Sequence, residues 1–361
     1  MNSPYGRSPI QFVMRPLRSA ALPVTLSLLA VIGCDAMTGT PDDTPSARVI
    51  FDNLDASILS VSGTNDGDIY AVGADNEDGL GPYLLHFDRS DNQWQRLETS
   101  VSGDLWWISV ETIDGVFYVV GENGTVLTLD PSDQSTDTMT IDDNPTLYGI
   151  WGTATDNLWT VGGDPEDIES GGVLLHFDGS AWIPVELGDI LPDGVPTLYK
   201  VWGRDANDIY VVGRRGLALH FDGNEWVELE TDTTSTIFTL HGDAQQVIAT
   251  GGIGNGVIAE LDGTMLNNRA DVGTPQMNGI SLNAGSSGVA VGNDGAIAVP
   301  GNDGTWQVQD NDVEIDGDFH AAWLDADGGI WAVGGDLSTA LDNGLIYYDG
   351  EFDVSSNVRN P

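Results

Sequence analysis

The sequence of 361 residues predicts an all-β fold, a seven-bladed β-propeller with four antiparallel strands in each blade. Three observations predict this fold. A short apolar run that ends in glycine recurs seven times, and its glycines are 38 to 51 residues apart. Other strand-like segments flank each run, separated by turns rich in Asp, Asn and Gly. Periodic helical stretches of useful length are absent from the sequence, and a repeat of about 40 to 50 residues is typical of propeller blades.

The glycine-ended runs, called marker strands below, are apolar throughout rather than alternating. Two of them read Phe-Tyr-Val-Val-Gly and Ile-Tyr-Val-Val-Gly. This pattern suits a strand that is covered on both faces, as the inner strands of a propeller are by the neighbouring blades. The seven runs occupy residues 69–73, 117–121, 158–162, 209–213, 247–251, 288–292 and 330–334.

The other strands of a blade surround the marker strand in the same order, as the third repeat illustrates. A first strand at residues 147–152 precedes the marker strand at residues 158–162. A third strand follows at residues 174–178, and an outer strand opens with Trp182. Short turns containing Asp, Asn and Gly separate these segments, which is the signature of antiparallel hairpins. Each repeat is therefore predicted to form one four-stranded blade.

Residues 48–361 are expected to form the propeller. They number 314, about 45 for each of seven repeats, which leaves no room for another domain. The last repeat ends with a third strand and the start of a fourth over residues 345–354. In one interpretation, residues 48–54 supply or supplement that outer strand and so close the ring. In the other, they take no part in the outer strand.

The first 33 residues are interpreted as an export signal. A basic, acid-free stretch up to Arg18 precedes an apolar run over residues 20–32, which is too short to span a bilayer comfortably. The run ends Leu-Ala-Val-Ile-Gly before Cys34, the single cysteine of the chain, and this sequence resembles the bacterial lipobox. The resemblance implies cleavage before Cys34 and attachment of acyl chains such as palmitate to that residue. An ordinary secretory signal with an incidental cysteine is the alternative.

The predicted organisation is a lipoprotein signal peptide over residues 1–33, a lipidated flexible linker over residues 34–47 and the propeller over residues 48–361. The linker is rich in Thr, Pro and Asp and has almost nothing to bury. The implied location is outside the cytoplasm, with the chain anchored to the bacterial membrane through Cys34 and facing the periplasm or the cell surface. Asp35 resembles an inner-membrane retention signal of enteric bacteria, but that rule is not general, so either membrane remains open.

The repeat pattern is similar to the secreted propeller repeats of bacterial envelope lipoproteins, near the kelch, Asp-box and photosystem-assembly-factor types. Two departures limit the resemblance. Gly223 follows Asp222 directly, whereas the Asp-box pattern has its glycine two residues after the aspartate. The Gly-His and Trp-Asp dipeptides of WD repeats are missing. These families share a scaffold with varied functions, so the resemblance implies architecture and no particular activity.

Charge excludes several classes of partner. The chain has 12 Lys and Arg against 56 Asp and Glu, a net charge of −44. Three of the basic residues and none of the acids precede Cys34, so a chain beginning there would carry −47. Such a surface repels nucleic acids and anionic membrane surfaces. The expected partners are the lipid bilayer, through acylated Cys34, and an envelope protein or glycan; a monomer is expected.

Four basic residues and one tryptophan are candidate binding residues. Lys200, Arg204, Arg214 and Arg215 lie within 16 positions of one repeat. Either they form ion pairs with adjacent acids, or they dock an anionic group of a partner. Trp106 adjoins Trp107, and one of this pair is expected to face the channel or the solvent. His86, His176 and His220 recur at one position of three repeats and are interpreted as structural rather than as a metal site.

Calcium is the one candidate cofactor. The loops between second and third strands are long at residues 74–82, 163–171 and 335–343, and they are rich in acids whose oxygens suit Ca²⁺. The alternative is that aspartates there cap local turns. These loops share a face with the links between blades, where partners would bind. The candidate ligands are Asp75, Glu77, Asp78, Asp164, Glu166, Asp167, Asp336 and Asp342.

The sequence favours a non-enzymatic binding or scaffolding module. The alternative is an envelope enzyme, a glycan hydrolase or lyase or a calcium-dependent hydrolase, that uses acids of the loop face. The histidines lack an adjacent nucleophile motif, which argues against a catalytic triad. Carboxylate pairs suited to glycosidase chemistry remain open, because their separation is invisible in a sequence.

Overall fold

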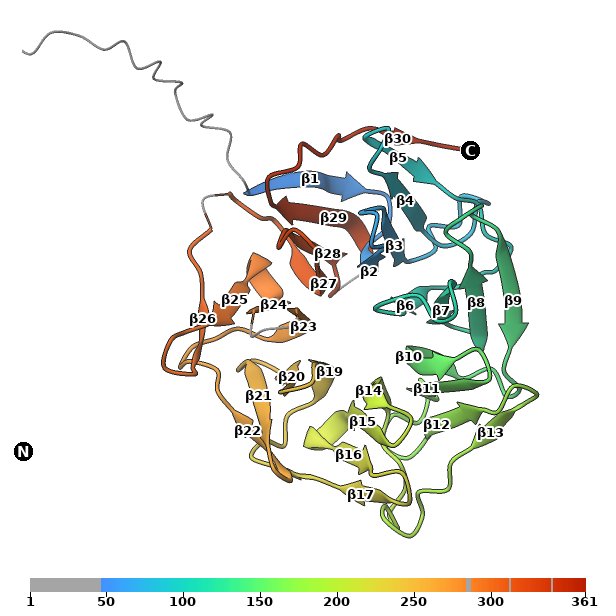
Figure 1. The fold of residues 1–361 in the computed structure, drawn as a ribbon, viewed down its shortest axis with the longest axis vertical. Coiled ribbons are helices and arrows are strands. Elements are labelled where there is room, and N and C mark those ends of the chain that lie inside the picture. Colours follow the sequence, from blue (N-terminus) through green and yellow to red (C-terminus); the bar gives the residue numbers. More distant parts are fainter. Residues whose placement is uncertain (1–46, 284–286, 312, 339) are drawn as a thin grey trace, which may run out of the picture. The chain divides into compact units, whose positions relative to one another are not determined.

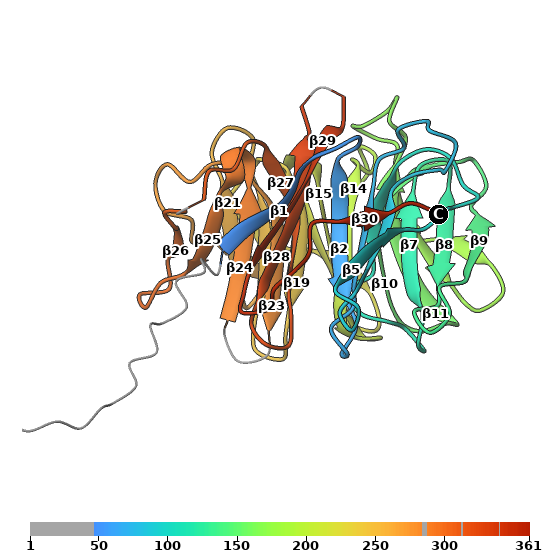
Figure 2. The same ribbon diagram turned by 90° about the horizontal axis from the view of Figure 1, so that it is seen from above.

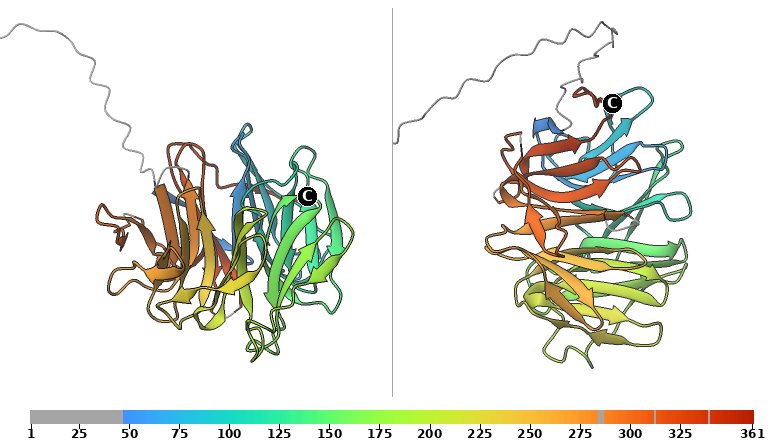
Figure 3. Two further views of the ribbon diagram at one scale, coloured as in Figure 1. Left: turned by 60° about the horizontal axis from the view of Figure 1, so that its bottom comes forward. Right: turned by 60° about the vertical axis from the view of Figure 1, so that its left-hand side comes forward.

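The propeller prediction is confirmed. The computed structural model describes residues 47–361 apart from 284–286, 312 and 339, so the predicted signal peptide, Cys34 and residues 35–46 of the linker lie outside the described residues. The described chain forms seven sheets arranged radially around a central axis (Figure 1). The inner strands run along that axis (Figure 2), and the blades follow one another around it in chain order (Figure 3). No helix in the described part is long and apolar enough to cross a membrane.

Each of the first four blades consists of consecutive strands ordered from the axis outward. Blade one contains β2 (Ile58–Gly63), β3 (Ile69–Gly73), β4 (Leu84–Asp88) and β5 (Gln93–Arg96). Blade two contains β6 (Leu105–Ile108), β7 (Phe117–Gly121), β8 (Thr125–Leu129) and β9 (Thr136–Thr140). Blade three contains β10 (Thr146–Ala154), β11 (Asn157–Gly163), β12 (Gly172–Phe177) and β13 (Trp182–Pro184). Blade four contains β14 (Leu198–Asp205), β15 (Asp208–Gly213), β16 (Ala218–Phe221) and β17 (Trp226–Glu228).

The last three blades follow the same plan, except that blade five has an additional outer strand and blade seven takes its outer strand from the N-terminal segment. Blade five contains β19 (Ile237–Gly242), β20 (Val247–Gly251), β21 (Val257–Asp262) and β22 (Met265–Asn268), with β18 (Glu230–Thr231) parallel to β22. Blade six contains β23 (Met277–Asn283), β24 (Ser287–Gly292), β25 (Ile297–Pro300) and β26 (Trp306–Val308). Blade seven contains β27 (Asp318–Leu324), β28 (Ile330–Asp336), β29 (Asp342–Asp349) and β1 (Ala47–Leu54). Single 3₁₀ turns follow β15 at Arg214–Gly216 and β24 at Asn293–Gly295.

The marker strands are the second strands of the seven blades, as predicted. Every residue of β3, β7 and β20 is buried, which explains why these runs lack alternation. A single twisted four-stranded sheet cannot cover both of its faces. In the ring each face packs on a neighbouring blade, so apolar residues are stabilising at all positions of the strand.

The first strand of every blade contains a β-bulge at the same place. Pairing between first and marker strands skips one residue there, and the extra residue is left out of the ladder. The seven bulge residues are Leu59, Trp106, Tyr148, Tyr199, Phe238, Asn278 and His320.

The bulges explain the marker glycines. In each blade a backbone carbonyl at the entry to the first strand comes so close to the marker glycine that a Cβ there would collide with it. For example, the carbonyl of Thr197 lies against Gly213 and accepts a hydrogen bond of 3.0 Å from the next peptide N–H, that of Arg214. The seven glycines are Gly73, Gly121, Gly162, Gly213, Gly251, Gly292 and Gly334.

The ring is closed by the N-terminal strand. β1 pairs antiparallel with β29 and forms the outer strand of blade seven (Figure 1), which confirms the interpretation that residues 48–54 close the ring. The prediction that residues 350–354 begin the fourth strand is wrong. That segment leaves blade seven, and β30 (Val358–Arg359) pairs in parallel with β5 of blade one. The outer edge of β29 is already occupied by β1, so the C-terminal segment continues to the next blade.

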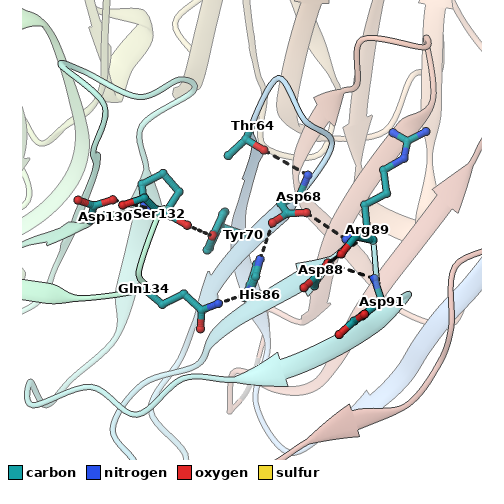
Figure 4. Close-up of polar contacts among 12 residues, drawn as sticks. Thr64, Asp68, Tyr70, His86, Asp88, Arg89, Asp91, Asp130, Ser132 and Gln134 are labelled. Atoms are coloured by element: carbon teal, nitrogen blue, oxygen red, sulfur yellow. Dashed lines mark hydrogen bonds and ion pairs between the residues drawn. The ribbon is translucent and has the colours of Figure 1, made fainter.

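The third-strand histidines are structural, as predicted. His86 Nε2 lies 2.9 Å from Asp68 Oδ2, and its Nδ1 accepts a hydrogen bond from the Gln134 amide of blade two at 3.1 Å (Figure 4). His176 and His220 make equivalent bonds to Asn157 and Asp208, of 2.8 and 2.7 Å. Each histidine thus connects the third strand to the start of the marker strand. The partner of His86 lies in the turn just before that strand, and the partners of His176 and His220 are its first residue.

Candidate functional site

A cavity of about 500 Å³ lies at one end of the central axis. The innermost strands of blades two to seven build it, and the β28–β29 loop contributes Leu337, Ser338 and Leu341. This end belongs to the face that carries the loops between second and third strands, which the sequence singled out as the partner face. A mostly apolar cavity with a few converging polar groups is typical of a ligand site. Two other hollows, at the opposite end of the axis and beside blade three, have more polar linings.

Aromatic bulge residues form a continuous arc around the cavity. The ring centroids of Trp106 and Tyr148 are 5.4 Å apart, those of Tyr148 and Tyr199 5.3 Å, and those of Tyr199 and Phe238 5.6 Å. On the other side, Trp106 lies 6.0 Å from the ring of His320. The bulge places equivalent residues of blades two to five next to one another, while the contact of Trp106 with His320 joins blade two to blade seven. We call these five residues the aromatic arc.

Lys200 of β14 lies beside the arc and is only 4% exposed. Its Nζ is 2.8 Å from the ring centroid of Trp107 in blade two and 3.5 Å from the carbonyl oxygen of Tyr148 in blade three. Gly149 makes this reach possible, because a Cβ there would lie 3.2 Å from the Cα of Lys200. Burial lowers the pKa of Lys200 well below its ordinary value. No ion pair joins Lys200 to a carboxylate within the described ranges.

The remaining polar groups of the cavity are held by hydrogen bonds. The Asn278 amide donates to Asn293 Oδ1 at 2.9 Å and to the carbonyl of Phe319 at 2.8 Å, and it accepts from Gln276 at 2.9 Å. His320 Nδ1 faces the carbonyl of Leu59, so it carries the proton and leaves Nε2 as an acceptor. Burial lowers the pKa of His320 to about 4, which keeps the ring neutral at physiological pH.

The structure separates the four candidate basic residues. Lys200 lines the axial cavity, whereas Arg204 lies at the opposite end of the axis and pairs with Asp208 at 2.6 Å. Arg214 and Arg215 both face Glu169, at 2.8 and 3.8 Å. The ion-pair interpretation thus describes the three arginines but not Lys200. Trp106 lines the cavity, and its role as a ligand contact stays a prediction.

The candidate calcium ligands mostly cap their own turns. Asp75 Oδ1 accepts from the N–H of Glu77 at 2.9 Å, and Asp164 Oδ1 accepts from that of Glu166 at 2.8 Å. Such Asx turns account for the aspartates without a metal. Over the residues that the structure describes, no group of three or more His, Cys, Asp or Glu side chains is arranged to hold a metal ion. Calcium binding stays an untested prediction. Asp78 and Asp167 lie on their predicted loops, whereas Asp336 ends β28 and Asp342 begins β29, where the two are paired across the ladder.

Asp75, Asp104 and Glu122 are linked by peptide N–H to carboxylate hydrogen bonds where blades one and two adjoin on the cavity face. Asp104 Oδ1 accepts from the N–H of Asp75 at 2.9 Å, and Glu122 Oε2 accepts from that of Asp104 at 3.3 Å. Burial raises the pKa of both Asp104 and Glu122. A carboxyl group with a raised pKa can act as a general acid, but here these oxygens accept the peptide N–H bonds that fix the local backbone.

Sequence reasoning missed most of the cavity. Apart from Trp106 and Lys200, its arc and amide residues were not singled out, although a signal was present. The bulge residue directly follows the first buried apolar residue of each first strand, as in Leu147-Tyr148, Leu198-Tyr199 and Ile237-Phe238. Aligning the seven first strands would have placed these aromatic residues at one position.

No family model matches the chain, and no curated protein matches it in sequence. Solved structures match in fold. The WD40 β-propeller domain of Doa1 has a TM-score of 0.63 at 10% identity, covering 86% of this chain and 98% of its own. The WD40 repeats of RRP9 give 0.64 at 10% identity, covering 86% and 99%.

The extracellular domain of a putative hybrid two-component system, BT3049 of B. thetaiotaomicron, has a TM-score of 0.60 at 10% identity, covering 82% of this chain and 40% of its own. At these identities the likeness concerns the fold alone. The chain is a seven-bladed β-propeller with WD40-like structural neighbours, although it lacks the sequence dipeptides of WD repeats.

Proposed function

We propose that this protein is a membrane-anchored, extracytoplasmic binding module that holds an envelope protein or glycan without catalysing a reaction. The observation that carries the proposal is the axial cavity with its aromatic arc. Aromatic rings provide large contact areas at a small entropic cost and are enriched where proteins bind ligands. The propeller fold is typical of protein-interaction scaffolds and presents this cavity on the face with the long loops.

The histidine contacts favour binding over catalysis. A catalytic triad needs a histidine between a nucleophile and an acid. All five histidines instead have structural partners: Asp68, Asn157 and Asp208 for the three on third strands, the carbonyl of Leu59 for His320, and the N–H of Leu282 for His241. Burial lowers the pKa of His241, like that of His320, to about 4. Such a group is a weak base at neutral pH.

Anchoring through Cys34 is tested by Cys34→Ser. We expect the native chain, expressed in a bacterium with the lipoprotein pathway, to take up an alkyne analogue of palmitate and to sediment with membranes. The variant lacks the sulfur that accepts the lipid, so it should lose the label and remain soluble. Equal labelling of the two forms would contradict the proposed anchor.

Binding through the cavity is tested by Trp106→Ala. We expect binding to envelope polysaccharides or to an envelope protein to weaken about tenfold or more, because a central aromatic contact is lost. Retention of immobilised ligands, first by the native protein and then by the variant, measures this effect. Trp226→Ala is the matched control, since Trp226 is half-buried on the outer strand of blade four, away from the cavity. Equal weakening by both variants would contradict the proposed site, and turnover of a polysaccharide by the native protein would support the enzyme alternative.

A further inference from the structure

We propose that the axial cavity recognises a carboxylate attached to a ring, with Lys200 as its charged partner and the aromatic arc as the surface on which the ring lies. The inference rests on the proposed binding function and names the chemical class of its ligand. A sugar acid and an aromatic acid both have this chemistry, and the experiment below distinguishes them.

The environment of Lys200 is the first argument. Taking an ammonium group out of water is unfavourable unless an anion compensates it. The chain has 56 acidic residues, yet none pairs with Lys200 in the described part of the structure. In place of an ion pair, its ammonium nitrogen has a long hydrogen bond of 3.5 Å to the carbonyl of Tyr148 and lies over the face of the Trp107 ring. A buried lysine without an acidic partner, at the wall of a cavity, is suited to receive an anion from a ligand.

The hydrogen-bonding capacity of Lys200 is the second argument. An ammonium group has three N–H donors. The Tyr148 carbonyl takes one, and the Trp107 ring attracts the charge without using up the remaining donors. A ligand oxygen that enters the cavity would therefore gain a charge-assisted hydrogen bond, which is stronger than a neutral one.

The charge pattern favours a carboxylate over other ions. An aromatic arc can also hold a quaternary ammonium group, but Lys200 would repel it. Phosphate carries more charge and is usually held by several cations or by the fork of an arginine. Among the described residues that line the cavity, Lys200 is the only lysine or arginine, and the acid Asp318 lies in the same wall. A single cation in the cavity wall matches a singly charged group.

The arc and the volume favour a ring as the rest of the ligand. The cavity of about 500 Å³ is within the range of sites for small molecules. Neighbouring rings of the arc, 5.3 to 6.0 Å apart, offer both faces and edges. The C–H face of a pyranose and the face of an aryl ring can both pack against such a surface. The amide of Gln276 lies in the same wall and, after donating one N–H to Asn278, retains a second N–H for a ring hydroxyl, whereas both N–H groups of Asn278 already donate to Asn293 and Phe319.

Binding should be coupled to proton uptake. Burial disfavours the ammonium form of Lys200 and lowers its pKa, whereas a bound carboxylate favours that form and raises the pKa again, so binding should shift Lys200 toward its protonated form. His241 and His320 have pKa values of about 4, and Tyr148 of about 12, so none of the three titrates near pH 8.5. The titratable groups facing Lys200 or lining the cavity with it are Tyr148 from β10, Tyr199 from β14, His241 from β19, and Asp318 and His320 from β27.

Isothermal titration calorimetry tests the proposal on the folded chain without its signal peptide. Galacturonate and phenylacetate are compared with their neutral counterparts, galactose and phenylacetamide, at pH 8.5 in two buffers of different ionisation enthalpy. We expect at least one acid to bind tenfold or more tightly than its neutral counterpart, with uptake of up to one proton. A preference for galacturonate would identify a sugar acid, and a preference for phenylacetate an aromatic acid.

Lys200→Met keeps the length and apolar stem of the side chain and removes its charge. We expect this variant to bind the acid and its neutral counterpart equally and to take up no proton. The midpoint temperature of its thermal unfolding should be at least as high as that of the native chain. Arg269→Met is the control, because Arg269 is 42% exposed near the outer strand of blade five and carries the same charge; it should keep the preference.

Two results would overturn the ring-carboxylate proposal. One is equal binding of acids and neutral counterparts, or no binding of any of them, by the native protein. The other is an undiminished preference for the acid in Lys200→Met. Neither result decides the wider binding function, which is tested separately by Trp106→Ala against its Trp226→Ala control and by the turnover of a polysaccharide.

Discussion

Replacing Gly162 by alanine is expected to lower the free energy of unfolding by about 3 kcal/mol. Gly162 ends the marker strand of blade three, and a Cβ there would meet the backbone carbonyl of Thr146. Backbone atoms in a buried ladder cannot rotate away as a flexible side chain can, so the bulge at Tyr148 would have to shift. Denaturation by urea, followed by tryptophan fluorescence, measures the loss.

Gly188→Ala is the matched control. Gly188 is exposed and has no atom within 4 Å of the position of a Cβ, so the same added methyl group should change stability by less than about 0.5 kcal/mol. If both variants were equally stable, close backbone approach would not be the reason for the marker glycines.

Replacing Phe51 by alanine is expected to cost about 4 kcal/mol. Phe51 belongs to β1, is paired with Ile346 of β29, and is 9% exposed. Its ring also meets Trp94 of blade one edge-on at 5.8 Å, so it joins the last blade to the first. The variant should lose both the buried ring and part of the strand that closes the propeller. Thermal and urea unfolding give the magnitude.

Phe352→Ala is the comparison for ring closure. Phe352 lies on the segment that leads to β30 and is half-buried. Its ring centroid is 4.7 Å from Cζ of Arg89. We expect less than about half of the loss caused by Phe51→Ala, because less apolar surface is buried there. A larger loss for Phe352→Ala would indicate that the C-terminal strand, rather than β1, holds the ring closed.

Most of the architecture could be predicted because the repeat encodes it locally. The apolar run, its glycine and the Asp-Gly turns recur in each blade, and each follows from contacts inside one blade or with the next. The failed prediction, a fourth strand over residues 350–354, concerned a place where two segments distant in sequence compete for one strand edge. The propensity of the C-terminal segment does not reveal that β1 already pairs with β29.

The basic cluster shows the same limit for the site. Lys200 and Arg204 are four residues apart on one strand, yet they lie at opposite ends of the axis because a strand rises about 3.3 Å per residue. Arg214 and Arg215 belong to the turn after the next strand and meet Glu169 of blade three. The four basic residues are close in sequence, which suggested that they share one surface. The rise of the strand instead places Lys200 and Arg204 at different ends of the propeller, with different neighbours.

The sequence by itself determined the seven repeats, their four strands, the buried marker strands and the acidic surface, since these depend on local pattern and composition. Only the tertiary structure decided which residues meet at the axis. Closing the ring brings the bulges of blades two to five together, and it brings His320 of blade seven against Trp106 of blade two. It also lets Lys200 cross Gly149 to reach Trp107. These contacts join residues of different blades, and no local rule in the sequence describes them.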